Sequence, residues 1–366
     1  MLGGLEHTQN ETALLLDSLI KAGEFPNASL FSGEKFTGRM FASRQVCLAM
    51  GIPDENILIV SDRNHAYRIR TALSLFSKQR NLSSKRFLKE NVSILLQQYH
   101  GALIEAQSTT AGKKRFADAA EVTEILRDLD CCDESQAEAI CAKLEKTLSP
   151  LMDLNRTASI TIGQVRAIRD WCATSSMDGQ DKMVIIEGLE NAGDSVVNGL
   201  LKTLEEPPSG CHFILISANS GRIPATILSR VRKFRFSELD DKRRSYILNS
   251  LFVDPSKYTS LEAFFLEGSG INDEMLLSCA EDLLYRRDFD LPALVAELEK
   301  IQGWDRFFEH VLNEISKAFI DGRLEERRAA YLLKAISEAV TKGRTFNQMK
   351  RLTFDYVIYR VKEVNR

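Results

Sequence analysis

A predicted helix that ends at two prolines and leads directly into a short apolar strand constrains the fold most strongly. Apolar residues recur at three- and four-residue spacing over 196–204, which predicts an amphipathic helix. A residue before proline is pushed out of the α region, so Pro207 and Pro208 end this helix. The run 212–217 is short and apolar, which is typical of a strand buried in a sheet. A polar turn at 218–221 follows the strand, and polar loops at the carboxyl ends of such strands are how open α/β sheets build ligand sites.

The segment after this strand continues the same pattern. A short helix with Pro224 in its first turn is predicted to end near Ser229 and Arg230. Residues 233–236 alternate between basic and aromatic side chains, which predicts a further strand.

A glycine loop near the N-terminus lies between a predicted strand at 28–31 and a predicted helix that runs through 49. Gly33 and Gly38 have the spacing of the two glycines of a phosphate-binding P-loop, and strand, loop and helix are the expected context. The sequence therefore predicts the backbone shape of a P-loop here.

The side chains that follow do not suit nucleotide chemistry. The position of the P-loop lysine holds Arg39, whose planar guanidinium does not replace a compact ammonium in a tight loop. The position whose hydroxyl would ligate magnesium holds Met40, and a thioether is a poor ligand for a hard cation that prefers oxygen. The loop is therefore predicted to lack its catalytic groups.

The stretches 200–208 (LLKTLEEPP) and 223–230 (IPATILSR) resemble the AAA+ clamp-loader subunits of bacterial DNA polymerase III. In that family the arginine of a Ser-Arg pair at the end of a helix reaches into the ATP site of the neighbouring subunit. The matching positions are Ser229 and Arg230, so the resemblance implies that Arg230 acts in trans and that Ser229 supports it. The alternative is an arginine that merely caps a helix C-terminus, where cations are favoured.

The resemblance implies a chain that is α/β in its first part and all-α in the rest. Residues 1–236 would form the AAA+ P-loop-type domain, with a parallel sheet and a helical insertion at about 61–155. Residues 237–285 would form a small helical lid, and residues 286–366 a C-terminal helical collar domain.

Two further departures from an active ATPase concern the predicted strand at 183–186 and a Gly-Ser pair. In active relatives two acidic residues follow this strand, one holding magnesium through water and the other orienting the attacking water. Here the positions hold Glu187, which keeps a charge, and Gly188, which cannot polarise water. Active relatives also carry an arginine just after a Gly-Ser pair, and none follows Gly268 and Ser269.

Within the family these losses imply a subunit without ATPase activity of its own that assembles the ring loading the sliding clamp onto primed DNA. The implied partners are the tau/gamma and delta subunits, with the clamp and primer-template DNA reached through the complex; no cofactor and no metal site are expected. The remnants of the nucleotide site are Gly33, Gly38, Arg39, Met40 and Glu187. A catalytically active ATPase of the tau/gamma type remains the alternative.

Bulk properties exclude several classes of protein. The formal net charge of −3 provides no global attraction to nucleic acid. No apolar run is long enough to cross a membrane, and the N-terminus lacks the pattern of a secretory signal, so a cytoplasmic location is expected. Seven cysteines without a CxxC pair favour free thiols over disulfides or zinc ligands.

The predicted insertion has an uneven charge. Residues 61–115 contain eleven basic and three acidic residues, whereas residues 116–148 contain three basic and nine acidic residues. The basic half could contact DNA phosphates, as in a DNA-binding regulator built on the same fold, or the two halves could pack as helices and neutralise one another. The scarcity of interleaved aromatic residues favours packing. The predicted helices are 66–77, 87–106, 116–129 and 137–148, and a short strand is predicted to open the segment 159–168.

Overall fold

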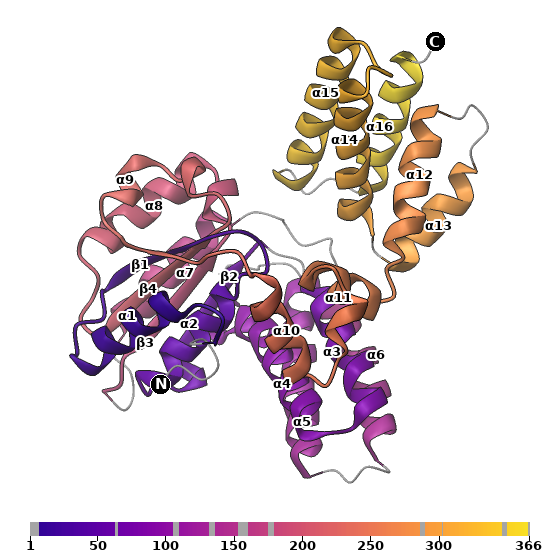
Figure 1. The fold of residues 1–366 in the computed structure, drawn as a ribbon. Helices are drawn as coiled ribbons and strands as arrows, with labels where there is room; N and C mark the ends of the chain where they lie inside the picture. Colours follow the sequence, from indigo (N-terminus) through magenta and orange to yellow (C-terminus); the bar gives the residue numbers. More distant parts are fainter. Residues whose placement is uncertain are drawn as a thin grey trace. The chain divides into compact units, whose positions relative to one another are not determined.

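The computed structural model describes residues 7–62, 65–104, 110–131, 136–152, 160–174, 179–285, 290–301, 303–345 and 350–364. Five parallel strands form one sheet in the order β2-β3-β4-β1-β5 (Figure 1). The strands are β1 (Ala28–Ser32), β2 (Ile57–Ser61), β3 (Lys182–Glu187), β4 (Cys211–Ser217) and β5 (Arg232–Arg235). The parallel α/β sheet expected from the sequence is therefore confirmed.

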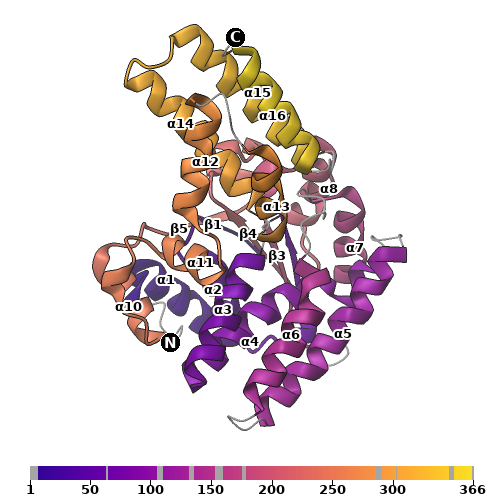
Figure 2. The same ribbon diagram turned by 90° about the vertical axis from the view of Figure 1, so that its right-hand side faces the viewer.

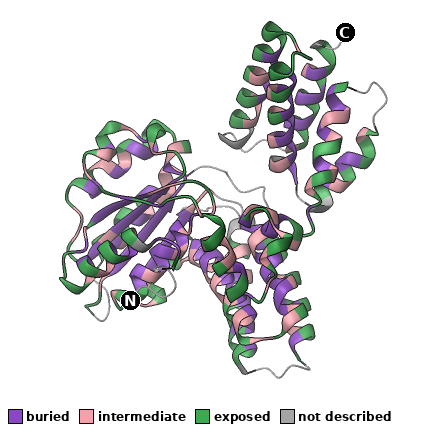
Figure 3. Ribbon diagram, in the orientation of Figure 1, coloured by how far each residue is buried: buried purple, intermediate pink, exposed green. Residues whose placement is uncertain are grey.

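The strands β1 to β4 are buried almost throughout, as Figure 3 shows, because helices cover both faces of the sheet. This burial explains their continuous apolar sequences, which contrast with the alternation of a half-exposed strand. At the edge, β5 exposes three basic residues and buries only Phe234. Charged side chains on an edge strand discourage pairing with other chains.

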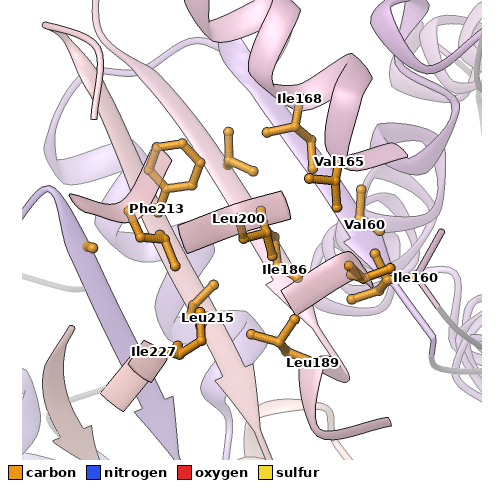
Figure 4. Close-up of a cluster of buried hydrophobic side chains, with 14 of the residues drawn as sticks. Val60, Ile160, Val165, Ile168, Ile186, Leu189, Leu200, Phe213, Leu215 and Ile227 are labelled. Atoms are coloured by element: carbon orange, nitrogen blue, oxygen red, sulfur yellow. The ribbon is translucent and has the colours of Figure 1, made fainter. Parts of the chain in front are cut away.

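Each face of the sheet has its own layer of helices. The helices α1 (Asn10–Lys21) and α2 (Arg39–Ala49) pack on one face around Phe31, Ile185 and Ile214. On the other face, a second core forms around α7 (Ile162–Ala173), α8 (Asp194–Glu205) and α9 (Ala225–Leu228). The residues labelled in this core include Ile186, Leu200, Phe213, Leu215 and Ile227 (Figure 4).

Two local predictions from the sequence were wrong because capping residues, rather than apolar spacing, set the helix boundaries. Thr161 caps α7 through a capping box with Gln164, so Ile160 and Thr161 lead into a helix without forming a strand. The helix predicted at 87–106 is α4 (Leu82–Leu96), because the Asn81 side chain accepts the Ser84 N–H at 2.8 Å. Two short 3-10 turns follow it, at Gln97–Tyr99 and Gly101–Leu103.

Four helices, α3 (Ala66–Gln79), α4, α5 (Thr110–Cys131) and α6 (Ala137–Met152), follow β2 and share one apolar core. Figure 2 shows them as one group. The Tyr99 hydroxyl donates to the Leu151 carbonyl across this core at 3.0 Å.

The opposite charges of the insertion meet across these helices. Lys89 of α4 contacts both carboxylate oxygens of Asp130 of α5 at 2.6 Å, and Lys85 donates to the Asp130 carbonyl at 3.1 Å. Arg80, just after α3, pairs with Glu138 of α6 at 3.3 Å. For these residues the structure supports mutual neutralisation of the two halves.

The chain divides into two compact units, one reaching to Glu262 and the other beginning at Ala263. The first unit also contains α10 (Asp241–Ser250), which Asp240 caps by accepting the Arg243 N–H. Helix α11 (Leu261–Gly268) spans the division. The expected lid at 237–285 is thus shared between the units.

Among the described residues of the second unit, all the regular secondary structure is helical. Its further helices are α12 (Asp273–Tyr285), α13 (Leu291–Ile301), α14 (Trp304–Ile320), α15 (Glu326–Thr345) and α16 (Lys350–Val364). Asp273, the first residue of α12, pairs with Arg306 of α14 through both carboxylate oxygens, at 2.7 and 2.8 Å. His310 approaches the same carboxylate at 2.7 Å, so α12 and α14 are joined by ionic contacts as well as by apolar packing.

Within the described part of the chain, no helix has both the length and the apolar character needed to span a bilayer.

Candidate functional site

The two P-loop glycines occupy positions where the backbone itself requires glycine. A Cβ on Gly33 would lie 2.4 Å from the carbonyl oxygen of Phe236, because the chain leaving β5 passes directly over the loop. Gly38 is the N-cap of α2 and has φ of +87°, a conformation that glycine adopts without strain. Both glycines therefore have structural roles that do not depend on a bound phosphate.

The next two residues start α2 and are buried. Arg39 is 3% exposed and Met40 is 6% exposed. The Met40 side chain belongs to the apolar core beneath α1 and α2, so it offers no oxygen for a magnesium ion. Met40 thus serves as a core residue on this face of the sheet.

A buried glutamine fastens the loop to the chain beyond β5. The Gln9 amide donates to the carbonyls of Thr37 and Ser237 at 3.2 and 2.7 Å, and it accepts the Ser237 N–H at 2.9 Å. The Thr37 hydroxyl donates to the Glu34 carbonyl at 2.9 Å within the loop. These bonds tie the loop to the segment that follows β5.

The carboxylate of Glu187 lies at the carboxyl end of β3 and is only 3% exposed as a residue. It accepts a hydrogen bond of 2.9 Å from the hydroxyl of Ser61, which ends the neighbouring strand β2. The His65 Nε2 atom lies 3.4 Å from the same hydroxyl. The Glu187 carboxylate is therefore hydrogen-bonded to a residue of the neighbouring strand in the same sheet.

Asp62 fills the space beside Gly188, where an active ATPase would carry its second acidic residue. A Cβ at Gly188 would lie 2.0 Å from the Asp62 Cγ and Oδ1 atoms. The Asp62 carboxylate is held there by the Asn191 side-chain amide, which donates at 2.7 Å. Gly188 also has φ of +93°, so a side chain at this position meets both strain and a collision.

Arg230 lies just beyond α9, and two elements hold its guanidinium. Its Nε donates to the Glu205 Oε1 atom at 2.8 Å, and its Nη2 contacts the same oxygen. Its Nη1 donates to the Thr226 carbonyl at 2.6 Å and to the Ser229 hydroxyl at 3.1 Å. The Arg230 side chain remains 30% exposed and the Glu205 side chain 43% exposed.

The first unit thus brings together the predicted site residues in two groups. Gly33, Gly38 and Glu187 lie at the carboxyl ends of the strands, whereas Ser229 and Arg230 lie at the end of α9. Among the residues that the structure describes, no group of three or more His, Cys, Asp or Glu side chains could hold a metal ion. Position 40 in the core and the crowded position 188 do not fit a magnesium site of the usual P-loop kind.

The sequence interpretation missed Asp62 and Glu205. Glu205 is the last residue of α8, where the negative end of the helix dipole disfavours a carboxylate. An acid at that position is a signal that a cation lies nearby. Asp62 had no comparable signal, because its neighbour Gly188 is 126 residues away along the chain.

Comparisons with known proteins agree with the resemblance. Residues 88–240 match the family model described as "DNA polymerase III, delta subunit". This match begins inside the segment predicted to be an insertion, and it includes the later part of α4 and the whole of α5 and α6.

The curated relatives are also subunits of DNA polymerase III, from other organisms. The gamma subunit of Buchnera aphidicola is 27% identical over 143 residues, which are 38% of this chain and 40% of that protein. The delta' subunit of Haemophilus influenzae is 36% identical over 78 residues, which are 21% of this chain and 24% of that protein. The chain thus spans less than half the length of either relative.

A solved structure of a DNA polymerase III gamma subunit-related protein from Thermotoga maritima aligns with 96% of this chain and 99% of its own, at 14% identity and a TM-score of 0.39. The family match and the curated relatives all concern subunits of DNA polymerase III. Over part of its length the chain is therefore similar to the gamma, tau and delta' subunits of DNA polymerase III.

Proposed function

We propose that this chain is a non-catalytic, delta'-like subunit of a clamp loader that donates Arg230 to the ATP site of a neighbouring subunit. The observation that carries the proposal is a contrast within the first unit. Arg230 is held partly exposed at the end of α9, whereas Met40 is buried in the core and Gly188 is crowded by Asp62. Arg230 is thus available to a neighbouring subunit's ATP site, whereas positions 40 and 188 lack the hydroxyl and the carboxylate that an ATP site in this chain would require.

An arginine supplied in trans stabilises the negative charge that develops on the transferred phosphoryl group. Such arginines raise turnover by about 10³ to 10⁵ in well-studied systems. Here Arg230 directly follows a short helix, α9, that is anchored by the fully buried Ile227. Ser229 supports the arginine by accepting a hydrogen bond from its Nη1 atom.

The remaining parts of the proposal concern assembly. The partners would be tau/gamma and delta subunits in the cytoplasm, with the sliding clamp and primer-template DNA contacted through the assembled complex. Residues 237–285 would serve as a lid, and residues 286–366 would join a helical collar. Apolar helix faces are suited to such subunit contacts.

The test compares ATP hydrolysis by a complex assembled from this chain with the tau/gamma and delta subunits, clamp and primed DNA of the same organism. We expect the chain alone to be inactive and Arg230→Ala to lower the turnover of the complex at least tenfold while the complex still assembles. Arg222→Ala is a matched control, because Arg222 is an exposed arginine in the turn between β4 and α9. Full turnover by the Arg230→Ala complex would refute donation in trans.

The second candidate is a tau/gamma-like ATPase. It is favoured by the gamma and tau relatives, whose matches cover 38% and 36% of this chain, against 21% for delta'. Magnesium-dependent hydrolysis by the isolated chain, abolished by Glu187→Gln, would establish it. A DNA-binding regulator is disfavoured by the ion pairs of Lys89 and Arg80 with acidic residues of the same helical group.

A further inference from the structure

We propose that Glu205 is a positioning residue that orients the Arg230 guanidinium toward a neighbouring subunit's nucleotide. This inference rests on the proposed function and deepens it. Glu205 belongs to α8 and Arg230 follows α9, so the pair joins two helices through residues 25 positions apart.

The contacts of Arg230 fix the plane of its guanidinium group. A guanidinium has five N–H donors in a rigid fork. Glu205 accepts from Nε and Nη2, while the Thr226 carbonyl and the Ser229 hydroxyl accept from Nη1. These four bonds leave one Nη2 N–H without an acceptor among the described residues, and that group can contact a phosphate oxygen without dismantling the pair.

Both supports of the arginine are attached to the core. Leu204, which precedes Glu205, is 3% exposed, and Ile227 of α9 is fully buried; both belong to the core between the sheet and the helices. The carboxylate and the α9 acceptors therefore present the arginine from rigid elements. Groups that are held in place before the partner binds lose less conformational freedom when the contact forms.

The position of Glu205 is unfavourable for the helix alone. A carboxylate in the last turn of α8 faces the negative end of the helix dipole. The Arg230 guanidinium compensates that charge, and no other ion pair of the Glu205 carboxylate occurs in the described part of the chain. The ion pair with Arg230, and not a contribution to the stability of α8, therefore explains the carboxylate at position 205.

The test measures ATP turnover of the assembled complex with Glu205→Gln, which keeps the shape of the side chain and removes its charge. We expect turnover at saturating ATP to fall roughly three- to tenfold, because a partly exposed ion pair contributes only a modest interaction energy. The KM for ATP and the affinity of assembly should not change. Glu206→Gln is the matched control, because this neighbouring glutamate is also exposed and its side chain forms no hydrogen bond or ion pair with the described residues. It should leave turnover unchanged.

A double-mutant cycle separates positioning from a general structural effect. If Glu205 acts only through Arg230, Glu205→Gln in an Arg230→Ala background causes no further loss of turnover. An equal loss in both backgrounds, or a rise in turnover with Glu205→Gln alone, would overturn the inference. If Arg230→Ala itself has no effect, the proposed function fails; if only Glu205→Gln has none, the positioning role fails and the arginine finger stands.

Discussion

Replacing Gly188 with alanine tests whether Asp62 leaves no room for a side chain at position 188. The added Cβ would lie 2.0 Å from the Asp62 carboxylate, in a backbone conformation with φ of +93°. Because atoms cannot approach so closely, the Asp62 side chain must leave its place beside Asn191.

Two terms set the loss in the free energy of unfolding that Gly188→Ala should cause. A non-glycine residue in this region of backbone space costs about 1–2 kcal/mol. Displacing Asp62 breaks a charge-assisted hydrogen bond to Asn191, which contributes about 1–2 kcal/mol. We therefore expect Gly188→Ala to destabilise the first unit by about 2–4 kcal/mol. Gly51→Ala is the control for the backbone term alone, because Gly51 has φ of +71° and open space around its Cβ position, and it should cost about 1–2 kcal/mol.

The assay is urea unfolding followed by tryptophan fluorescence. The chain has two tryptophans, Trp171 in the first unit and Trp304 in the second. A Trp304→Phe background therefore confines the signal to the unit that contains Gly188. In an Asp62→Ala background the collision is relieved, and Gly188→Ala should then cost no more than Gly51→Ala.

Two results would refute this reasoning. One is a Gly188→Ala protein whose stability lies within about 0.5 kcal/mol of the parent, which is the range of ordinary surface substitutions. The other is a cost that is the same with and without the Asp62 carboxylate, since the crowding would then come from elsewhere.

Two further predictions concern charged contacts. The Arg306 hydrogen bond, assisted by His310, lowers the Asp273 pKa to about 2 from 3.8 against the opposing effect of burial. The stability that the ionised Asp273 carboxylate contributes is therefore fully present above pH 3.8 and is lost as the pH falls through about 2. Because the carboxylate is partly exposed to solvent, this contribution amounts to about 1 kcal/mol. Asp273→Asn should lower stability at pH 7, measured by urea unfolding, and the difference from the parent should shrink below pH 4; a constant difference would contradict the linkage. Separately, Lys89→Ala should cost at most about 1 kcal/mol, because its pair with Asp130 is partly exposed. Binding of the free chain to duplex DNA, followed by fluorescence anisotropy at low salt, should not change; a clear loss would support a DNA-binding role for the basic half.

The sequence predicted most of the elements of the first unit because their signals are local. Apolar runs located β3 and β4, and helical spacing with a proline stop located α8. The same reasoning failed where a capping side chain moved a boundary: Asn81 starts α4 early, and Thr161 turns a predicted strand into the lead-in of α7. A single cap outweighs apolar spacing there because it satisfies N–H groups that the helix leaves unpaired.

The sequence by itself determined the kinds of residue at the candidate site: Arg39 and Met40 after the glycine loop, Gly188 after an apolar strand, and Arg230 at the end of a short helix. Only the tertiary structure decided what surrounds them. It placed Asp62 against Gly188 and Glu205 against Arg230. Those contacts join residues that are distant along the chain. Asp62 meets Gly188 because the parallel strands β2 and β3 end at the same edge of the sheet. Glu205 meets Arg230 because α8 and α9 pack on the same face of the sheet.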